Sequence, residues 1–470
     1  MIILDSQKET VRLASGLRSD GILSKNTIKR ALASIHRFAE RLQAAHITQF
    51  RVVGTNTLRA AKNADGFLER AEEILQSPID IISGTEEARI IYLGIANDFA
   101  PTDKKRLIVD IGGGSTELVV GLKKPENLQS IHMGCVTYSQ RYFEDGMITR
   151  KAFDKALLAA RSEIQEFVNQ FSSKRWQEAV GSSGTIRAIE SVLEGLSLNN
   201  EHVITLEGLS TLANKLCEFD CVEKLNLPNL NDDRKAVFPG GLAVLLGLFI
   251  ELKIEQMHVS SYALREGIIF ELAGRKTSTD IREQTVQQMM KQYYCDEQQS
   301  KRITEFASKM LEQTKNDFEQ YDQSLQTLRW ALSLHEIGLA ISYSGYHKHG
   351  AYILLNCDMP GFSKREQILL SFIVLNHRRK LRPLPQTYGF EPDWRLVQIA
   401  RVAWLFCRRR DDNVLPTFIN ISFKGDTLKL ALKEQWLLDN PLIEEDLLNE
   451  QNFLEQLNLT LQIKRLSDDN

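Results

Sequence analysis

The residues best suited to chemistry lie in one run, Leu107–Val120. Its apolar ends predict two buried strands, and between them Asp110 and Glu117 flank the glycine turn Gly112–Gly114 and the hydroxyl of Ser115. Glycines let the backbone approach a ligand closely and point its N–H groups at an anion. A carboxylate beside a bound phosphate needs a cation between the two. The run therefore predicts a phosphate site that contains Mg²⁺.

Two alternatives to this interpretation are a P-loop and a plain hairpin. The P-loop is excluded because no Gly-Lys-Ser/Thr sequence follows, and because Glu117–Val120 has the composition of a strand rather than a helix. A hairpin with a glycine turn and no ligand remains open when the run is considered alone.

Three further turns carry polar side chains, and each follows a predicted strand: Gly54–Arg59, Ser83–Arg89 and Gly181–Thr185. Ligand sites in open α/β sheets lie at such strand ends. With the glycine run, the turns supply amides, hydroxyls, an arginine and acids, which are the groups needed to transfer a phosphoryl group to water.

Each of these turns also has a purely structural explanation. Glu86 and Glu87 favour the positive end of a helix, Arg59 is also typical of a surface cation, and Gly181–Thr185 is also typical of a loop that enters a helix. The functional interpretation is favoured because all four motifs occur in one chain.

Strands and helices alternate in the first part of the chain, which predicts an α/β fold. The expected elements are a helix over 24–45 capped by Ser24, a strand over 49–55, a helix over 63–76, a strand over 79–84 and a helix over 85–97 capped by Thr85. After Pro101 the pattern repeats, with the glycine hairpin, a helix over 151–171 and a strand over 176–180. Two such halves predict a duplicated fold with a cleft between them.

The pattern changes near Ser278. Helical periodicity continues to about Asp411, and a predicted hairpin, 417–423 with 428–432, belongs to a small final α/β cap. Two basic clusters stand out, one formed by Arg378, Arg379, Lys380 and Arg382 and the other by Arg408, Arg409 and Arg410. Each is either solvated surface or part of a positive path for a long polyanion.

Composition limits the class of protein. With 470 residues, 43% of them hydrophobic, and a net charge of −3, the chain is long enough for several globular domains and has no general attraction for nucleic acid. Six scattered cysteines without a CxxC pair predict reduced thiols in the cytoplasm. Met1–Asp5 begins no secretory signal, and the longest apolar stretch, Gly240–Ile250, is too short to span a membrane and predicts a core helix.

Taken together, the motifs resemble the exopolyphosphatase / guanosine pentaphosphate phosphohydrolase family of the actin-like ATPase superfamily. The matching stretches are Gly54–Arg59, Ile81–Arg89, Val109–Glu117, Met133–Thr137, Gly181–Thr185, Ala263–Gly267 and Leu334–Gly338. The resemblance implies an α/β fold with duplicated ribonuclease H-like (actin-like) domains over 1–96 and 97–277. A helical HD-like domain over 278–412 and a small C-terminal α/β domain over 413–470 are expected to follow.

The resemblance also implies an activity, the release of terminal orthophosphate from inorganic polyphosphate or from pppGpp, which gives ppGpp. Glu87 is expected to activate water, and Asp110 and Glu117 to bind Mg²⁺. The implied phosphate-binding residues are Arg59, Gly112, Gly113, Gly114, Ser115, Ser182, Ser183, Gly184 and Thr185. A homodimer is implied as well. Met133–Thr137 and Arg408–Asp412 are more similar to the pentaphosphate phosphohydrolase branch.

The chain departs from the family pattern in two places. Family members begin with a strand and an Asp-x-Gly-Ser-Asn/Thr phosphate loop, whereas Met1–Ser6 aligns with the strand that follows this loop. We expect an N-terminus that is incomplete in this sequence, since the other motifs are present. In the helical domain, Glu336 stands where an HD pair has its aspartate, so we expect packing and substrate contact there rather than metal binding.

Two other functions remain open. A protein that senses polyphosphate or guanosine tetra- and pentaphosphate without turnover would explain the absent first loop. A transferase similar to sugar or acetate kinases shares the superfamily, but a water-activating acid at Glu87 argues against it.

Overall fold

The computed structural model contains two compact units, Met1–Thr279 and Asp280–Asn470, and each is described by itself. The residues it describes are 7–18, 20–45, 47, 50–99, 103–199, 203–274, 280–388, 390–416 and 419–467. The predicted strand over Met1–Ser6 lies outside this part of the chain, as do Gln49 and Thr417–Phe418 at the ends of two other predicted strands.

The first unit begins with a small lobe of helices around two short parallel strands. Its elements are α1 (Lys25–Ala44), β1 (Val52–Gly54), α2 (Asn56–Ala60), α3 (Asp65–Leu75) and β2 (Ile79–Ile81). The hydroxyl of Ser24 accepts a hydrogen bond from the amide of Thr27, which confirms the predicted cap of α1. Apolar side chains of α1, α3 and the strands form the core of this lobe.

A six-stranded mixed sheet forms the centre of the unit, in the order β5-β4-β3-β6-β8-β7. The strands are β3 (Arg106–Ile111), β4 (Thr116–Gly121), β5 (Pro125–Ile131), β6 (Glu178–Ser182), β7 (Val203–Thr205) and β8 (Gln256–Val259). β3 and β4 are antiparallel, as the glycine run predicts, and β3 and β6 are parallel.

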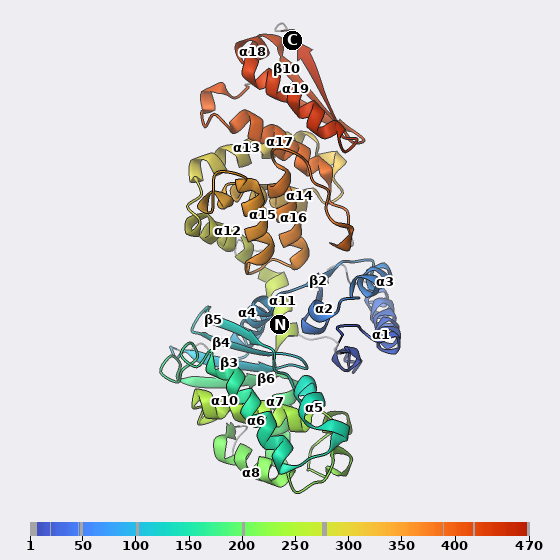
Figure 1. Ribbon diagram of the computed structural model, residues 1–470, viewed down its shortest axis with the longest axis vertical. Coiled ribbons are helices and arrows are strands. Elements are labelled where there is room, and N and C mark those ends of the chain that lie inside the picture. Colours follow the sequence, from blue (N-terminus) through green and yellow to red (C-terminus); the bar gives the residue numbers. More distant parts are fainter. Residues whose placement is uncertain are drawn as a thin grey trace. The chain divides into compact units, whose positions relative to one another are not determined.

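Helices cover both faces of this sheet (Figure 1). One face packs against α5 (Cys135–Tyr142), α6 (Arg150–Gln165), α7 (Ser183–Gly195), α8 (Leu206–Leu216) and α10 (Phe238–Leu252). α4 (Gly84–Ala96) covers the other face and packs against α11 (Leu264–Gly274). Successive side chains of a strand point to opposite faces of the sheet. Leu107 and Val109 therefore face the helices α5, α6, α7, α8 and α10, while Ile108, Val119 and Val180 face α4.

α10 is the predicted core helix, and nearly every residue in it is buried. No helix in the described part of the chain is long and apolar enough to cross a membrane.

Two predicted boundaries in this unit are wrong. The helix expected over 151–171 ends at Gln165. Phe171 is buried beyond this end, and its carbonyl oxygen accepts a hydrogen bond from Nε1 of Trp176 at 2.9 Å rather than from a helix amide. The strand expected over 176–180 covers Glu178–Ser182, since pairing with β3 sets its register. Gly181 and Ser182 therefore belong to a strand rather than to a turn.

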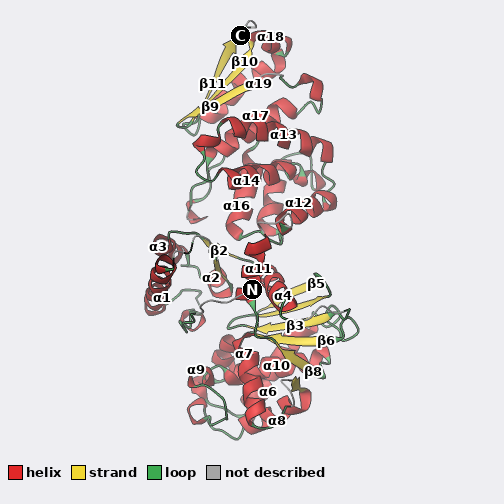
Figure 2. Ribbon diagram, turned by 180° about the vertical axis from the view of Figure 1, so that it is seen from behind, coloured by secondary structure: helices red, strands yellow, loops and turns green. Residues whose placement is uncertain are grey.

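The second unit is a helical bundle followed by a small α/β layer (Figure 2). The bundle contains α12 (Ile281–Gln292), α13 (Glu297–Gln313), α14 (Tyr321–Ser333), α15 (Tyr346–Asn356), α16 (Lys364–Asn376) and α17 (Trp394–Cys407). The layer contains β9 (Ile419–Lys424), β10 (Thr427–Lys433), α18 (Glu434–Asp439), α19 (Pro441–Glu455) and β11 (Thr460–Leu466).

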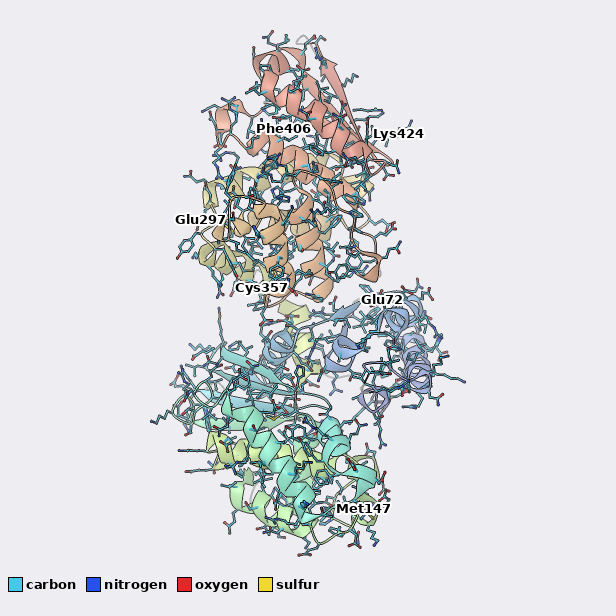
Figure 3. All side chains as sticks on the ribbon, viewed as in Figure 1. Glu72, Met147, Glu297, Cys357, Phe406 and Lys424 are labelled. Carbon is cyan, nitrogen blue, oxygen red and sulfur yellow. The ribbon has the colours of Figure 1, made fainter. Side chains whose placement is uncertain are left out.

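β9 and β10 form the predicted antiparallel hairpin, while β11, which pairs in parallel with β10, was not predicted. Figure 3 labels Phe406, which is fully buried in the core of this unit, and Lys424, which is the last residue of β9.

A buried network of charges fixes α4 in the first unit. Arg89 on α4 forms two hydrogen bonds of 2.8 Å to Glu86 and also contacts Glu271 on α11. Arg51 contacts the same Glu271 and donates a hydrogen bond of 2.8 Å to Asp80 on β2. One buried carboxylate therefore joins α4 and α11 to the small lobe.

Replacement of Glu271 by alanine should lower the free energy of unfolding by about 3 kcal/mol, because it leaves two buried guanidinium groups with one partner fewer. Denaturant unfolding followed by circular dichroism measures this change. Glu207→Gln, at an exposed position of α8, is the control. A loss within about 0.5 kcal/mol of zero, the size expected for a surface substitution, would contradict the structural role of the network.

Candidate active site

Three strands bring polar side chains to one place on the sheet. In the register of the strands, Asp110 on β3 lies directly opposite Glu117 on β4 and Ser182 on β6. Residues paired in this way point to the same face. By alternation that is the face of Ile108 and Val119, which α4 covers. On the sheet face that α4 covers, the apolar side chains of Ile108 and Val119 are therefore followed by the acids Asp110 and Glu117.

Glu87 projects from the first turn of α4. The helix begins because the hydroxyl of Ser83 accepts a hydrogen bond from the amide of Glu86 at 3.1 Å. The predicted cap, Thr85, is wrong: its hydroxyl instead lies 3.0 Å from that of Ser83. Glu87 is buried, at 8% exposure, and the positive end of the helix favours a negative charge there.

Arg59 approaches Glu87 from the small lobe. Its Nη1 donates hydrogen bonds to the carbonyl oxygen of Ile82, at 2.7 Å, and to Oε2 of Glu87, at 3.1 Å. Arg59 lies on the short helix α2 and is only partly exposed, so it is not the surface cation that its sequence context also allowed. It holds one oxygen of Glu87 in place.

All three acids have raised pKa values, and burial is the largest cause for each. Burial, followed by the charge of Glu87, raises the pKa of Asp110 to about 7, and contact with the Ser182 hydroxyl acts in the opposite direction. Burial, Glu87 and Asp110 raise the pKa of Glu117 well above its usual range. Burial also raises the pKa of Glu87, although Arg59 opposes this. The three carboxylates cannot all be ionised at neutral pH without a compensating cation.

Mg²⁺ is compatible with this arrangement. Within the described residues there is no preformed cluster of three metal-ligating side chains. Mg²⁺, however, needs only one or two carboxylates, since water and substrate phosphate complete its shell. Asp110 and Glu117 are buried, and neither forms an ion pair with a basic side chain in the part of the chain described. Their carboxylates therefore fit a cation held partly by the substrate.

The glycine turn presents its backbone beside the acids. The amide of Gly112 donates to the carbonyl oxygen of Ser115 at 2.9 Å, which closes the turn, and the carbonyls of Gly112 and Gly113 accept the first amides of α5. No described residue accepts the amides of Gly113 and Gly114. A Cβ at Gly114 would lie 2.6 Å from Nδ2 of Asn56, so a larger residue there would have to displace the Asn56 side chain. Free amides in a close turn are suited to phosphate.

The predicted loop over Gly181–Thr185 is divided in the structure. Ser182 lies beside Asp110, and its hydroxyl donates to the carbonyl oxygen of Tyr262 at 2.7 Å. Ser183 begins α7 with a φ of 89°, and a Cβ at Gly184 would lie 2.2 Å from Nη2 of Arg234. Thr185 acts to lower the pKa of the Cys135 thiol, although burial raises it overall. Only Ser182 of this group is thus placed directly beside the acids.

Two residues near the site, Ser130 and Arg234, were not predicted. The hydroxyl of Ser130 donates to Oε1 of Glu117 at 2.8 Å. Thr55, which belongs to the predicted turn Gly54–Arg59, acts to lower the pKa of Glu87. Arg234 approaches the loop at Gly184. Ser130 could have been found by extending the hairpin, since it pairs with Glu117 in the register of β4 and β5. No motif around Arg234 in the sequence indicates that this residue lies near the site.

Replacement of Asp110 by asparagine should stabilise the metal-free protein, and the gain should grow with pH. A carboxyl group with a pKa of about 7 when folded and 3.8 when unfolded costs no stability below pH 3.8, and its full cost is reached above pH 7. The gain should therefore increase by about 3 kcal/mol between pH 5 and pH 8. Unfolding experiments in EDTA measure it, with the exposed Asp103→Asn as the control. A gain that does not change with pH would contradict the raised pKa.

Two family models match the chain. The model described as the Ppx/GppA phosphatase family matches residues 1–276, and the model described as Ppx/GppA phosphatase, domain III, matches residues 281–451. Together they cover most of both compact units.

Relatives are similar along nearly the whole chain, and three of them are named guanosine-5'-triphosphate,3'-diphosphate pyrophosphatase. The identity is 38% over 448 residues for the protein of Pseudoalteromonas translucida, which covers 94% of this chain and 89% of the relative. It is 36% for the protein of Photobacterium profundum and 35% for that of Aliivibrio fischeri, again covering 94% of this chain, and 89% and 88% of these relatives.

Solved structures share the fold. A crystal structure described as an exopolyphosphatase-like protein has a TM-score of 0.52 and 24% identity, covering 57% of this chain and 90% of its own. The exopolyphosphatase of Cytophaga hutchinsonii also has a TM-score of 0.52, with 20% identity, covering 57% of this chain and 89% of its own. These likenesses support the mixed α/β architecture.

Proposed function

The chain belongs to the Ppx/GppA phosphatase family, and on that premise we propose that it hydrolyses guanosine 5'-triphosphate 3'-diphosphate (pppGpp) to ppGpp and orthophosphate. The observation that carries this proposal is the group of buried acids, Glu87, Asp110 and Glu117, beside a turn with free amides. The relatives named as pyrophosphatases support the choice of substrate.

Glu87 is the proposed general base. Its raised pKa makes it a better proton acceptor near neutral pH than an ordinary carboxylate. Arg59 bonds its Oε2, which orients the carboxylate. In the reaction, the oxygen of a water molecule bonds to the terminal phosphorus, the bond from that phosphorus to the bridging oxygen breaks, and Glu87 receives the proton of the water.

The phosphate is proposed to bind where the free amides and hydroxyls converge. The amides of Gly113 and Gly114 have no acceptor among the described residues, so they can donate to its oxygens, and Ser115 lies close to Glu117. Ser182 lies beside Asp110, and its hydroxyl would have to release the carbonyl oxygen of Tyr262 to donate to the phosphate. These groups fix the terminal phosphorus in line with the water and stabilise the charge on its oxygens, which is most of what phosphoryl transfer requires from a protein. Ser183, Gly184 and Thr185, with Arg234 close by, are proposed to meet the next phosphates.

The cation of the site is proposed to be Mg²⁺, held by Asp110 and Glu117, and when bound it neutralises the charge on phosphate oxygens. The same acids fit this role because their raised pKa values reflect a site that lacks positive charge. The finer architecture, with duplicated actin-like domains and a helical HD-like domain, is proposed on the same family relationship.

A sensor without turnover is disfavoured. It would need no buried base, yet Glu87 is buried, and Arg59 donates a hydrogen bond to it. The relatives named as pyrophosphatases also support turnover.

Replacement of Glu87 by glutamine should reduce kcat for orthophosphate release from pppGpp by about 10²- to 10⁴-fold, because the amide cannot accept the proton of water. The assay uses Mg²⁺, with long-chain polyphosphate as a second substrate. Glu144→Gln, which changes an exposed acid of the same unit, is the matched control. Full activity of Glu87→Gln with both substrates would rule out Glu87 as the base.

A further inference from the structure

The hydroxyl of Ser130 is a polar group at the site to which the hydrolysis proposed above gives no role. Ser130 lies on β5 and Glu117 on the neighbouring strand β4, and the two residues are paired in the register of these strands. Paired residues point to the same face of a sheet. Ser130 therefore lies on the face that α4 covers, next to one of the two acids proposed to hold the cation.

A direct hydrogen bond joins these two side chains. Oγ of Ser130 donates to Oε1 of Glu117 at 2.8 Å. Hydrogen bonds to an ionised carboxylate are among the stronger ones in proteins. Glu117 is only 1% exposed, so bulk water has little access to compete for this oxygen. The bond therefore fixes the direction in which the carboxylate of Glu117 points.

The start of α4 confines the side chain of Ser130. A Cβ at Gly84, the first residue of α4, would lie 2.5 Å from Cβ of Ser130 and 2.6 Å from its Oγ. The backbone of α4 therefore packs directly against this serine, and the absence of a side chain at Gly84 leaves the space that the serine occupies. Because this contact limits the rotation of Ser130, its hydroxyl is kept at Glu117.

The number of oxygens that a carboxylate offers influences which cation it binds. Mg²⁺ is small and requires a nearly ideal octahedron of oxygens at about 2.1 Å. The two oxygens of one carboxylate are too close together to fill neighbouring corners of so small an octahedron. Ca²⁺ is larger, binds oxygens at about 2.4 Å, and accepts both oxygens of a carboxylate. A carboxylate with one oxygen already engaged is therefore better suited to Mg²⁺ than to Ca²⁺.

From these observations we propose that Ser130 is a positioning residue that engages Oε1 of Glu117 and leaves Oε2 as the single oxygen for the cation. The site thereby binds a small divalent cation more tightly and disfavours Ca²⁺. This inference rests on the cation site of the function proposed above, and it adds the residue that determines which cation that site takes. Ser130 acts through Glu117 and not on the cation, as hydrogen-bond partners of metal ligands generally do.

Calorimetric titration of the full chain without substrate, with Mn²⁺ and separately with Ca²⁺, tests the proposal. Mn²⁺ is the probe for the small cation because it shares the six-oxygen octahedral coordination of Mg²⁺. Ser130→Ala should weaken Mn²⁺ binding about tenfold, which is the usual effect of removing the partner of a metal ligand. Ca²⁺ binding should weaken less, because the released Oε1 can join Oε2 in binding it. The ratio of the Mn²⁺ affinity to the Ca²⁺ affinity should therefore fall.

Ser210→Ala is the matched control. Ser210 lies at an exposed position of α8, and its hydroxyl also donates a hydrogen bond of 2.8 Å, to the carbonyl oxygen of Leu206. This variant should change neither affinity. A loss of packing alone would weaken both cations alike, so the ratio of the two affinities separates positioning by Ser130 from a merely structural role.

Four results would overturn the proposal: no Mn²⁺ binding by the wild-type chain, an unchanged Mn²⁺ affinity in Ser130→Ala, equal losses for the two cations, or the same loss in Ser210→Ala. Asp110→Asn identifies the origin of a failure. If it removes Mn²⁺ binding while Ser130→Ala has no effect, the cation site stands and only the role of Ser130 is wrong. If neither variant affects Mn²⁺ binding, the cation site itself is wrong. The Glu87→Gln assay tests hydrolysis independently of both.

Discussion

The structure depends on the burial of three carboxylates, Glu87, Asp110 and Glu117, which raises the pKa of each, and the charge of Glu87 raises the pKa of the other two further. Such a group is unfavourable in a protein interior unless its charge is balanced. Two of the acids face each other because of the register of one hairpin, and the third comes from the first turn of the helix that covers the same sheet face. Because the burial of these charges lowers the stability of the protein, we interpret the three acids as a functional site rather than a structural one.

The surrounding structure supplies what keeps these acids in place. Arg59 balances Glu87, and the hydroxyl of Ser130 donates a hydrogen bond to Glu117. Behind α4, the contacts of Glu271 tie the helix to the small lobe, so the base at its first turn has a fixed position. A positive charge is still lacking at Asp110 and Glu117, and a cation together with phosphate fits that need.

Local sequence patterns predicted the parts of the site that one hairpin or one helix can determine. Asp110 and Glu117 are an example, because the glycine turn and the apolar strands on both sides of it require their pairing. Sequence patterns did not predict the features that depend on contacts between segments distant along the chain. Arg234 reaches Gly184 through tertiary packing alone, and β6 is shifted because β3 sets its register. The pairing of Arg410 with two acids was not predicted either, since those acids are distant from it along the chain.

The central claim is that water attacks the terminal phosphorus of pppGpp. Hydrolysis of pppGpp in water enriched in ¹⁸O tests this most directly, with mass spectrometry of both products. The account predicts one solvent oxygen in each orthophosphate released and none in ppGpp. Label in ppGpp together with unlabelled orthophosphate would place the attack at another phosphorus, and this result would contradict the account.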